Sequence, residues 1–459
     1  MSSSILYIKP EEIDTVEKRG RYTVSVVGCG QIGVLHACLF AEAGFRVKCV
    51  DTDQTIVNSI LRGKISLLKR EIGLKLKNHV KTGRLNATTD AKTAVSQSDV
   101  INITVPVEIG EKKKADYSNL ENTCKRVGSG LRRGSLVVVM STVGVGVTQG
   151  LVIEVFENTS GFKVGADFGL AYSPIRTLNE QTLENVANQE RIIAATDKNS
   201  LNAASTILGT FTKGRLKKTE CVKTAEAVTL FEAMQQDVNV ALANELALFC
   251  EKAKVDYLEA HKLAKICTYP VLSLPTLDDG NTREDSYLLS EDSENLNFKL
   301  RVSTIAREIN EEITKHAINL TKDALRNCGK TLRRARISVL GILQTPNTKS
   351  PPKKMVEELA KMLEARGAKV SVYDPYFSGD EMGEMPYCLK KNLSEALEGI
   401  DCILILTGHD QFKRLNLKKL KALMKMPAAI VDFEGIVEPD KVEKEGFIYR
   451  GLGRGVWTK

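Results

Sequence analysis

The stretch YTVSVVGCGQIGVLHACLFAEAGFRVKCVDTD, residues 22–53, decides the fold of this chain. It opens with a β-branched run, Thr23 to Val27, and passes through a turn that contains Gly28, Gly30 and Gly33. A helical pattern and a second apolar run follow the turn. This order of strand, glycine turn, helix and strand predicts a βαβ unit.

The three glycines have separate mechanical uses in such a unit. Gly28 permits the tight turn, Gly30 lets the backbone approach a pyrophosphate, and Gly33 lets the helix lie close to the strand. The helix that starts at Gln31 and Ile32 presents unpaired N–H groups to the anion. We therefore expect these five residues to bind a dinucleotide.

An acidic residue ends the second apolar run. Asp51 lies where a carboxylate accepts hydrogen bonds from both hydroxyls of a ribose. A 2′-phosphate would meet a like charge there, so the sequence favours NAD over NADP as the cofactor.

Length and composition bound the class of protein. The chain has 459 residues, 42% of them hydrophobic, which predicts two or three domains with their own cores. Its net charge of +8 is spread among acids rather than concentrated in one arm. Nucleic-acid binding is therefore not expected, whereas binding of small anions is compatible with the charge.

The cysteines and the hydropathy pattern indicate where the protein works. Ten cysteines lack CxxC pairing, so we expect reduced, mostly buried thiols and no metal site. We find no run of 18 uncharged apolar residues and no signal-peptide core, so no membrane association is expected. The predicted location is the cytoplasm.

Further strands follow the first unit. VINITV at residues 100–105 and LVVVM at residues 136–140 are predicted to be buried parallel strands, and residues 168–172 a further one. Thr104-Val105-Pro106 leaves the first of these strands toward the cofactor crevice, and Ser141-Thr142 follows the next strand with two hydroxyls. Taken alone, either segment also fits a simple strand cap.

The middle of the chain changes character. Residues 224–254 predict a long helix, because they contain no Gly or Pro and carry an apolar stripe wide enough for more than one partner. Residues 270–295 predict a loop-rich acidic segment, and residues 302–325 a second helix.

A second α/β pattern begins at Arg336. It includes ISVLGI, a helix over residues 355–366 and strands at 369–373, 401–407 and 428–431, but no three-glycine fingerprint. The predicted fold class is α/β, with two Rossmann-like doubly wound domains joined by a central long-helix dimerisation domain. The expected domains are residues 1–213, 214–330 and 331–459, and no role is predicted for residues 1–20.

The order of these motifs resembles the nucleotide-sugar dehydrogenases, a family that includes the UDP-glucose and UDP-N-acetylmannosamine enzymes. The matching stretches are VVGCGQIG with Asp51, GRLNATTD with SDVINITVP, KKKADYSNL, STV at 141–143, AYSP at 171–174, VNVALANELA at 238–247, AREIN at 306–310, YDPY at 373–376 and GLGRG at 451–455. The resemblance covers nearly the whole chain. It implies an NAD domain, a dimerisation domain, and a C-terminal domain that holds the nucleotide of a sugar substrate.

Chemistry in this family is a four-electron oxidation of a sugar C6 alcohol to an acid. The resemblance implies a cysteine thiolate that captures the aldehyde, a lysine and an asparagine that stabilise an oxyanion, and a glutamate. In this chain the thiol position falls on Asn281, the lysine on Thr229, the asparagine on Ala233 and the glutamate on Ile175. An arginine of the C-terminal domain is replaced by Glu434.

Other positions of the family pattern survive. The resemblance implies a catalytic site at Thr142 and Asp285 with Asn281, and substrate contacts from Arg307, Asn239 and Tyr287. It also makes Ser141 and Thr142 cofactor contacts. Arg307 alone also fits a surface charge, and Asp285 a solvated loop.

Three hypotheses follow for the function. The first is an NAD-dependent oxidoreductase that performs a two-electron step on a sugar nucleotide, as a net oxidation or a redox-neutral epimerisation. The second is a non-catalytic NAD-binding regulatory subunit. The third is an altered substrate, because Glu434 would repel a phosphate. A homodimer or higher homo-oligomer is expected in each case.

Overall fold

The computed structural model describes residues 4–63, 65, 70–110, 112–175, 182–264, 273–277, 280–350, 352–377 and 387–457, with only the backbone described at 70 and 280–284. The chain divides into two compact units. The N-terminal unit comprises Met1–Ala233 and Glu284–Lys299, and the C-terminal unit comprises Met234–Arg283 and Leu300–Lys459. The three domain boundaries expected from the sequence stay a prediction.

The N-terminal unit contains an eight-stranded sheet in the order β10-β9-β8-β7-β4-β1-β2-β3. The strands are β1 (Thr23–Val27), β2 (Arg46–Val50), β3 (Leu85–Thr88), β4 (Val100–Ile103), β7 (Leu136–Val139), β8 (Gly169–Tyr172), β9 (Arg191–Ala195) and β10 (Leu216–Thr219). Neighbours pair in parallel except β8 with β9. The strand order reverses between β1 and β4, so the carboxyl ends of these strands form the expected ligand crevice.

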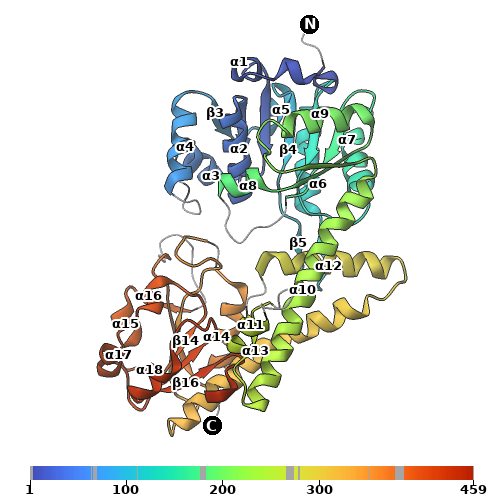
Figure 1. The fold of residues 1–459 in the computed structure, drawn as a ribbon. Coiled ribbons are helices and arrows are strands. Elements are labelled where there is room, and N and C mark those ends of the chain that lie inside the picture. The colour runs from blue at the N-terminus through green and yellow to red at the C-terminus, as the bar shows by residue number, and fades with distance from the viewer. Residues whose placement is uncertain are drawn as a thin grey trace. The chain divides into compact units, whose positions relative to one another are not determined.

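Helices cover both faces of this sheet (Figure 1). They are α1 (Val16–Arg19), α2 (Gln31–Ala43), α3 (Gln54–Leu61), α4 (Arg70–Lys81), α5 (Ala91–Ser96), α6 (Ser118–Gly128), α7 (Ile153–Ser160), α8 (Leu183–Asn188) and α9 (Lys198–Leu208). The apolar side chains of α2 and α9 share one core cluster, and those of α5, α6 and α7 share another. A short antiparallel hairpin, β5 (Glu108–Ile109) with β6 (Ala115–Asp116), adds to the unit.

Aspartates set the starts of several helices. Asp53, Asp90 and Asp197 accept hydrogen bonds from main-chain N–H groups in the first turns of α3, α5 and α9. The N-terminal lead-in also has a structural role, because Ile5, Leu6, Ile8 and Ile13 are buried in the core beside α2 and α9.

Within the described ranges, four helices lie between the two sheets in the sequence. They are α10 (Val222–Ala253), α11 (Tyr257–Ala264), α12 (Gly280–Asn295) and α13 (Arg301–Asn327). The long helix expected at residues 224–254 is confirmed, as is the one at 302–325. The loop-rich segment expected at residues 270–295 is wrong from Gly280 onward. Burial of Ser286, Leu288 and Leu289 explains how tertiary packing makes that acidic stretch helical.

The C-terminal unit contains a six-stranded parallel sheet in the order β13-β12-β11-β14-β15-β16. Its strands are β11 (Arg336–Leu340), β12 (Lys369–Tyr373), β13 (Cys388–Leu389), β14 (Cys402–Ile405), β15 (Ala429–Asp432) and β16 (Ile448–Gly451). Its helices are α14 (Lys354–Glu364), α15 (Leu393–Leu397), α16 (Asp410–Lys413), α17 (Leu417–Leu423) and α18 (Pro439–Lys444). α13 and α14 pack on one face and the other helices on the opposite face. The predicted fold class is confirmed.

Seven of the nine described cysteines are buried and all nine are free, while Cys221 and Cys388 are exposed. Hydrogen bonds from Thr224 lower the pKa of the Cys221 thiol. Among the described residues, every helix is too short or too polar to cross a bilayer.

Candidate functional site

The glycine turn between β1 and α2 has the geometry that its sequence predicts. Gly28 has a φ of +92°, which favours glycine, and a Cβ at this position would lie 2.8 Å from Cγ1 of Val105. A Cβ on Gly33 would lie 2.0 Å from the carbonyl oxygen of Gly28, so only glycine lets α2 approach the turn this closely. A Cβ on Gly30 would have no neighbour within 4 Å. There is therefore no room for a side chain at Gly28 or Gly33, whereas the space beside Gly30 is open.

The open side of the turn coincides with the start of α2. Gly30 is the N-cap of this helix and no side chain caps it, which leaves N–H groups near Gln31 and Ile32 available to an anion. The Asp51 carboxylate accepts hydrogen bonds from the main-chain N–H of Cys29 at 2.7 Å and of Asp53 at 3.0 Å. These bonds fix the acid at the end of β2, beside the turn. The turn and the acid fit a dinucleotide.

The end of β4 closes the other side of the turn. Thr104 donates its hydroxyl proton to the carbonyl oxygen of Gly28 at 2.6 Å, and Val105 is buried against the same glycine. Pro106 follows and is exposed. Val105 therefore supports the shape of the turn, whereas direct contact of Val105 and Pro106 with the cofactor stays a prediction.

The loop after β7 is fixed by three side chains. The carboxylate of Glu226 on α10 accepts from the N–H groups of Gly146 at 2.6 Å and Thr148 at 2.9 Å. Asp292 on α12 accepts from Val145 at 2.7 Å, and the Tyr117 hydroxyl accepts from Gly144 at 3.0 Å. The loop therefore joins α10 and α12 to the carboxyl end of β7.

Burial governs the protonation of these three groups. Loss of hydration raises the pKa of Glu226 and of Asp292, and it raises the pKa of Tyr117 to about 12. Ser141 and Thr142, predicted as cofactor contacts, begin this loop. The Ser141 hydroxyl is buried and, within the described part of the chain, has no hydrogen-bond partner.

In the C-terminal sheet the strand order reverses between β11 and β14, and a buried dyad lies near that point. Nε2 of His409 donates to Oδ2 of Asp374 at 3.0 Å, while the main-chain N–H of Asn347 donates to Nδ1 at 2.9 Å. The Asp374 carboxylate also accepts from the N–H groups of Ile342 and Leu343. The dyad thus fixes the turn after β11 against the end of β14.

Charge at this edge is balanced locally. The buried Lys353 ammonium donates to the carbonyl of Leu406 at 2.5 Å and pairs with Glu434 at 3.3 Å. The repulsion that Glu434 would exert on a phosphate is therefore offset by Lys353. Burial raises the pKa of the neighbouring Asp432 to about 6, and the charge of Glu434 adds to that shift.

Comparison with known proteins assigns a domain to each of the two sheets described above. Models of the UDP-glucose/GDP-mannose dehydrogenase family match the chain as an NAD binding domain at residues 22–212, a central domain at 223–312 and a UDP binding domain at 338–439. The chain belongs to the UDP-glucose/GDP-mannose dehydrogenase family. Its cofactor is NAD, and the protein is an oxidoreductase that acts on CH–OH groups.

Relatives match almost end to end. A UDP-N-acetyl-D-mannosamine dehydrogenase from Pyrococcus horikoshii is 31% identical over 438 residues, which cover 94% of this chain and 99% of that protein. The structure of UDP-D-ManNAc dehydrogenase from the same organism has a TM-score of 0.86, at 30% identity, and covers 95% of this chain and 100% of its own. An NDP-N-acetyl-D-galactosaminuronic acid dehydrogenase from Methanosarcina mazei has a TM-score of 0.79 at 25% identity, with coverage of 100% and 99%.

The structure describes the side chains at three of the positions where the sequence predicts replaced catalytic residues. Ile175, at the glutamate position, is half-buried and packs on the apolar core. Thr229, at the lysine position, is buried beside Tyr172, and Ala233, at the asparagine position, is buried on the same helix. Asn281 lies in the first turn of α12 with only its backbone described.

Three of the predicted site residues lie on α12, namely Asn281, Asp285 and Tyr287. Burial raises the pKa of Tyr172 at the end of β8, and the carboxylates of Glu226 and Asp285 raise it further. Asp285 is thus near the end of β8. Tyr287 lies under the ammonium of Lys113, which is 5.6 Å from its ring centre. The catalytic role of Asp285 and the substrate contact of Tyr287 stay predictions.

The substrate contacts expected on α10 and α13 belong to the C-terminal unit. Arg307 is buried and pairs with Asp237 at 2.9 Å, in a network that includes Asn310 and Asn244. Asn239 is exposed on α10. A contact of either with substrate stays a prediction.

Sequence reasoning missed the groups that fix the loop after β7. Glu226 could have been found, because it is a lone acid among apolar positions at the start of the long helix. Asp292 lies in a run of acids and Tyr117 in a polar stretch, so neither carried a signal of its own.

Substitutions in the glycine turn should separate folding from cofactor binding. We expect Gly30→Leu to change the free energy of unfolding by less than about 1 kcal/mol and to weaken NAD binding at least about tenfold, since its side chain fills space open to the pyrophosphate. Gly33→Ala should lower the free energy of unfolding by about 1–3 kcal/mol, because it forces α2 away from Gly28. Urea denaturation and NAD titration by calorimetry measure both effects. Equal loss of stability in the two variants would contradict the assignment.

The buried Asp432 predicts a pH dependence. Its native pKa of about 6 is above the ordinary 3.8, so the ionised form is disfavoured in the folded state. The contribution of Asp432 to the free energy of unfolding is therefore fully present below pH 3.8 and is lost as the pH rises through 6. Asp432→Asn should remove this loss, which is about 3 kcal/mol over the full titration for a shift of about two pKa units and about 2 kcal/mol between pH 4.5 and 7.5. Urea denaturation of both proteins at pH 4.5 and 7.5 tests the difference. An unchanged difference between the two pH values in the variant would show that Asp432 does not titrate in this way.

Proposed function

We propose that the protein oxidises a UDP-linked N-acetylhexosamine, such as UDP-N-acetyl-D-mannosamine, by a two-electron step that stops at the carbonyl. Support for the substrate comes from the matched UDP binding domain and from relatives named UDP-N-acetyl-D-mannosamine dehydrogenase over nearly their full length. Support for the shortened reaction comes from the side chains at the expected catalytic positions.

The observation that carries this proposal is the chemistry around Ile175, Thr229 and Ala233. Oxidation beyond the aldehyde in this family requires covalent capture by a thiol and donors for an oxyanion. Ile175 packs in the apolar core, Thr229 carries no charge and Ala233 carries no polar group. Loss of one oxyanion donor typically raises the barrier by about 3–4 kcal/mol, so losing both, along with the thiol, stops the second oxidation.

The two-electron step makes fewer demands on the protein. NAD, when bound, supplies the hydride acceptor. The alcohol carbon loses its C–H bond with the electron pair, the hydroxyl proton passes to a base, and a C=O bond forms. We assign Asp285 as the proton acceptor, Thr142 as the group that orients the hydroxyl, and Asn281 as a polar neighbour at the former thiol position. Substrate contacts from Arg307, Asn239 and Tyr287 are part of the same proposal.

The quaternary state and location are also proposals. α10 carries exposed apolar side chains at Phe231, Leu242 and Phe249, which are 58%, 44% and 63% exposed. A second copy would cover such side chains, so we propose a homodimer formed through α10. Free, mostly buried cysteines are compatible with action in the cytoplasm.

The yield of NADH per sugar tests the reaction. With limiting UDP-N-acetyl-D-mannosamine and excess NAD we expect one NADH per sugar, measured by absorbance, and an aldehyde or ketone that borohydride reduces back. Two NADH per sugar, with an acid as product, would contradict the proposal. Deuterium transfer with no net NADH would instead indicate an epimerase, and bound NAD with no transfer a regulatory subunit.

A matched pair of variants on α12 tests the assigned base. Asp285→Asn should lower kcat by about 10²–10⁴-fold, the usual contribution of a positioned acid or base. Glu294→Gln removes an exposed carboxylate from the same helix and should leave kcat unchanged. Equal rates for the two variants would exclude Asp285 as the proton acceptor.

A further inference from the structure

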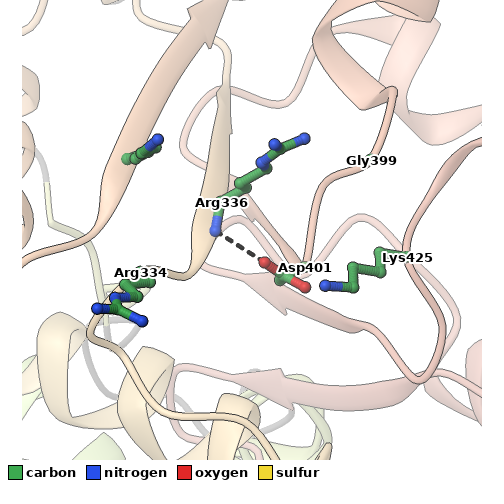
Figure 2. Close-up of a pocket in the computed structure, with 6 residues that line it drawn as sticks. Arg334, Arg336, Gly399, Asp401 and Lys425 are labelled. Carbon is green, nitrogen blue, oxygen red and sulfur yellow. Dashed lines mark hydrogen bonds between the residues drawn. The ribbon is translucent and has the colours of Figure 1, made fainter.

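The C-terminal unit has a basic pocket at the amino ends of its strands. Figure 2 shows side chains from β11, from the segment before it and from the segment after α17 around this pocket. Its volume is about 480 Å³, and it is lined by Arg334, Arg336, Lys369, Gly399, Asp401 and Lys425. Pockets of this size hold nucleotide-sized ligands. The switch point between β11 and β14 is at the carboxyl ends of the same strands, so the basic pocket is a separate place.

The pocket has an excess of positive charge. Its one acid, Asp401, is nearly buried and already satisfied, because it pairs with Lys330 at 2.7 Å and accepts from the main-chain N–H of Arg336 at 2.8 Å. Within the described ranges, the side chains of Arg334, Arg336, Lys369 and Lys425 have no acidic partner. Four like charges around one cavity repel one another, and an anion would relieve that repulsion.

The helix ends near this pocket do not account for the four cations. Cations often lie at helix C-termini, where they interact with unpaired carbonyls. Here the carbonyls of Leu363, Leu397 and Leu423, at the ends of α14, α15 and α17, accept hydrogen bonds from main-chain N–H groups. These three carbonyls therefore do not need the four basic side chains as partners.

Backbone geometry also shapes the pocket. Arg334 has a φ of +68°, an uncommon conformation for a residue with a side chain, and its N–H donates to the carbonyl of Gly367 at 2.7 Å. Gly399 has a φ of +65°, and a Cβ there would lie 3.1 Å from Nη1 of Arg336. Arg334, two residues before β11, and Gly399, before β14, thus both line the pocket beside Arg336 with uncommon backbone conformations.

We propose that this pocket binds a small anion with two or more phosphate groups. Arginine guanidinium groups recognise phosphate oxygens through paired N–H donors, and lysines add charge. Inorganic pyrophosphate and the diphosphate of a nucleotide share this chemistry. The site goes beyond the proposed oxidation, and it does not depend on that reaction.

Calorimetric titration of the whole protein with inorganic pyrophosphate tests the proposal. The triple variant Arg334→Gly, Lys369→Gln, Lys425→Gln should bind pyrophosphate at least about tenfold more weakly, and NAD affinity should not change. Binding to the wild type should weaken as salt rises, as expected for exposed charges. Titration with UDP in both proteins shows whether the pocket prefers the free anion or the nucleotide, since the variant loses affinity for whichever ligand uses it.

Two further variants serve as controls for folding and for the general loss of positive charge. Arg334→Gly alone suits the positive φ, so it should fold and still weaken pyrophosphate binding several-fold. Lys418→Gln with Lys419→Gln removes two exposed charges from α17 and should leave pyrophosphate affinity within twofold of wild type. The proposal is overturned if the wild type binds no pyrophosphate, or if the triple variant binds it as tightly as the Lys418–Lys419 control.

Discussion

The close approach of α2 to the turn after β1 is the constraint on which the N-terminal site depends. Gly33 leaves room for the Gly28 carbonyl, and Thr104 ties that carbonyl to the end of β4. Because these contacts close two sides of the turn, Gly30 and the uncapped start of α2 are left open. Asp51, fixed by Cys29 N–H, completes a surface that matches the diphosphate and ribose of NAD.

A second constraint connects this crevice to the central helices. Glu226, Asp292 and Tyr117 hold the loop after β7 through four main-chain N–H groups. Removing these acidic groups from water costs free energy, and the hydrogen bonds to main-chain N–H groups offset that cost. Residues 284–299, which include most of α12 and Asp285, belong to the N-terminal unit, although the residues on either side of them in the sequence belong to the other unit.

The fold was largely predictable from the sequence, and the site only in part. The sequence predicted elements well where the spacing of apolar residues was regular, as in β1, α2 and the 32-residue α10. The helix at 280–295 escaped prediction because its apolar positions are few and its burial comes from tertiary contacts. The partner of Glu434 escaped it as well, since Lys353 is 81 residues away in the chain and only the fold brings the two together.

The central claim is that a scaffold able to bind NAD has lost the groups that carry an aldehyde on to an acid. A crystal structure with NAD and UDP-N-acetyl-D-mannosamine tests it most directly. The account predicts the pyrophosphate against Gly30, a ribose on Asp51, and Thr142 and Asp285 beside the reacting carbon, with Asn281 in place of a thiol. A cysteine, a lysine and an amide side chain together within bonding reach of the nicotinamide ring would contradict it.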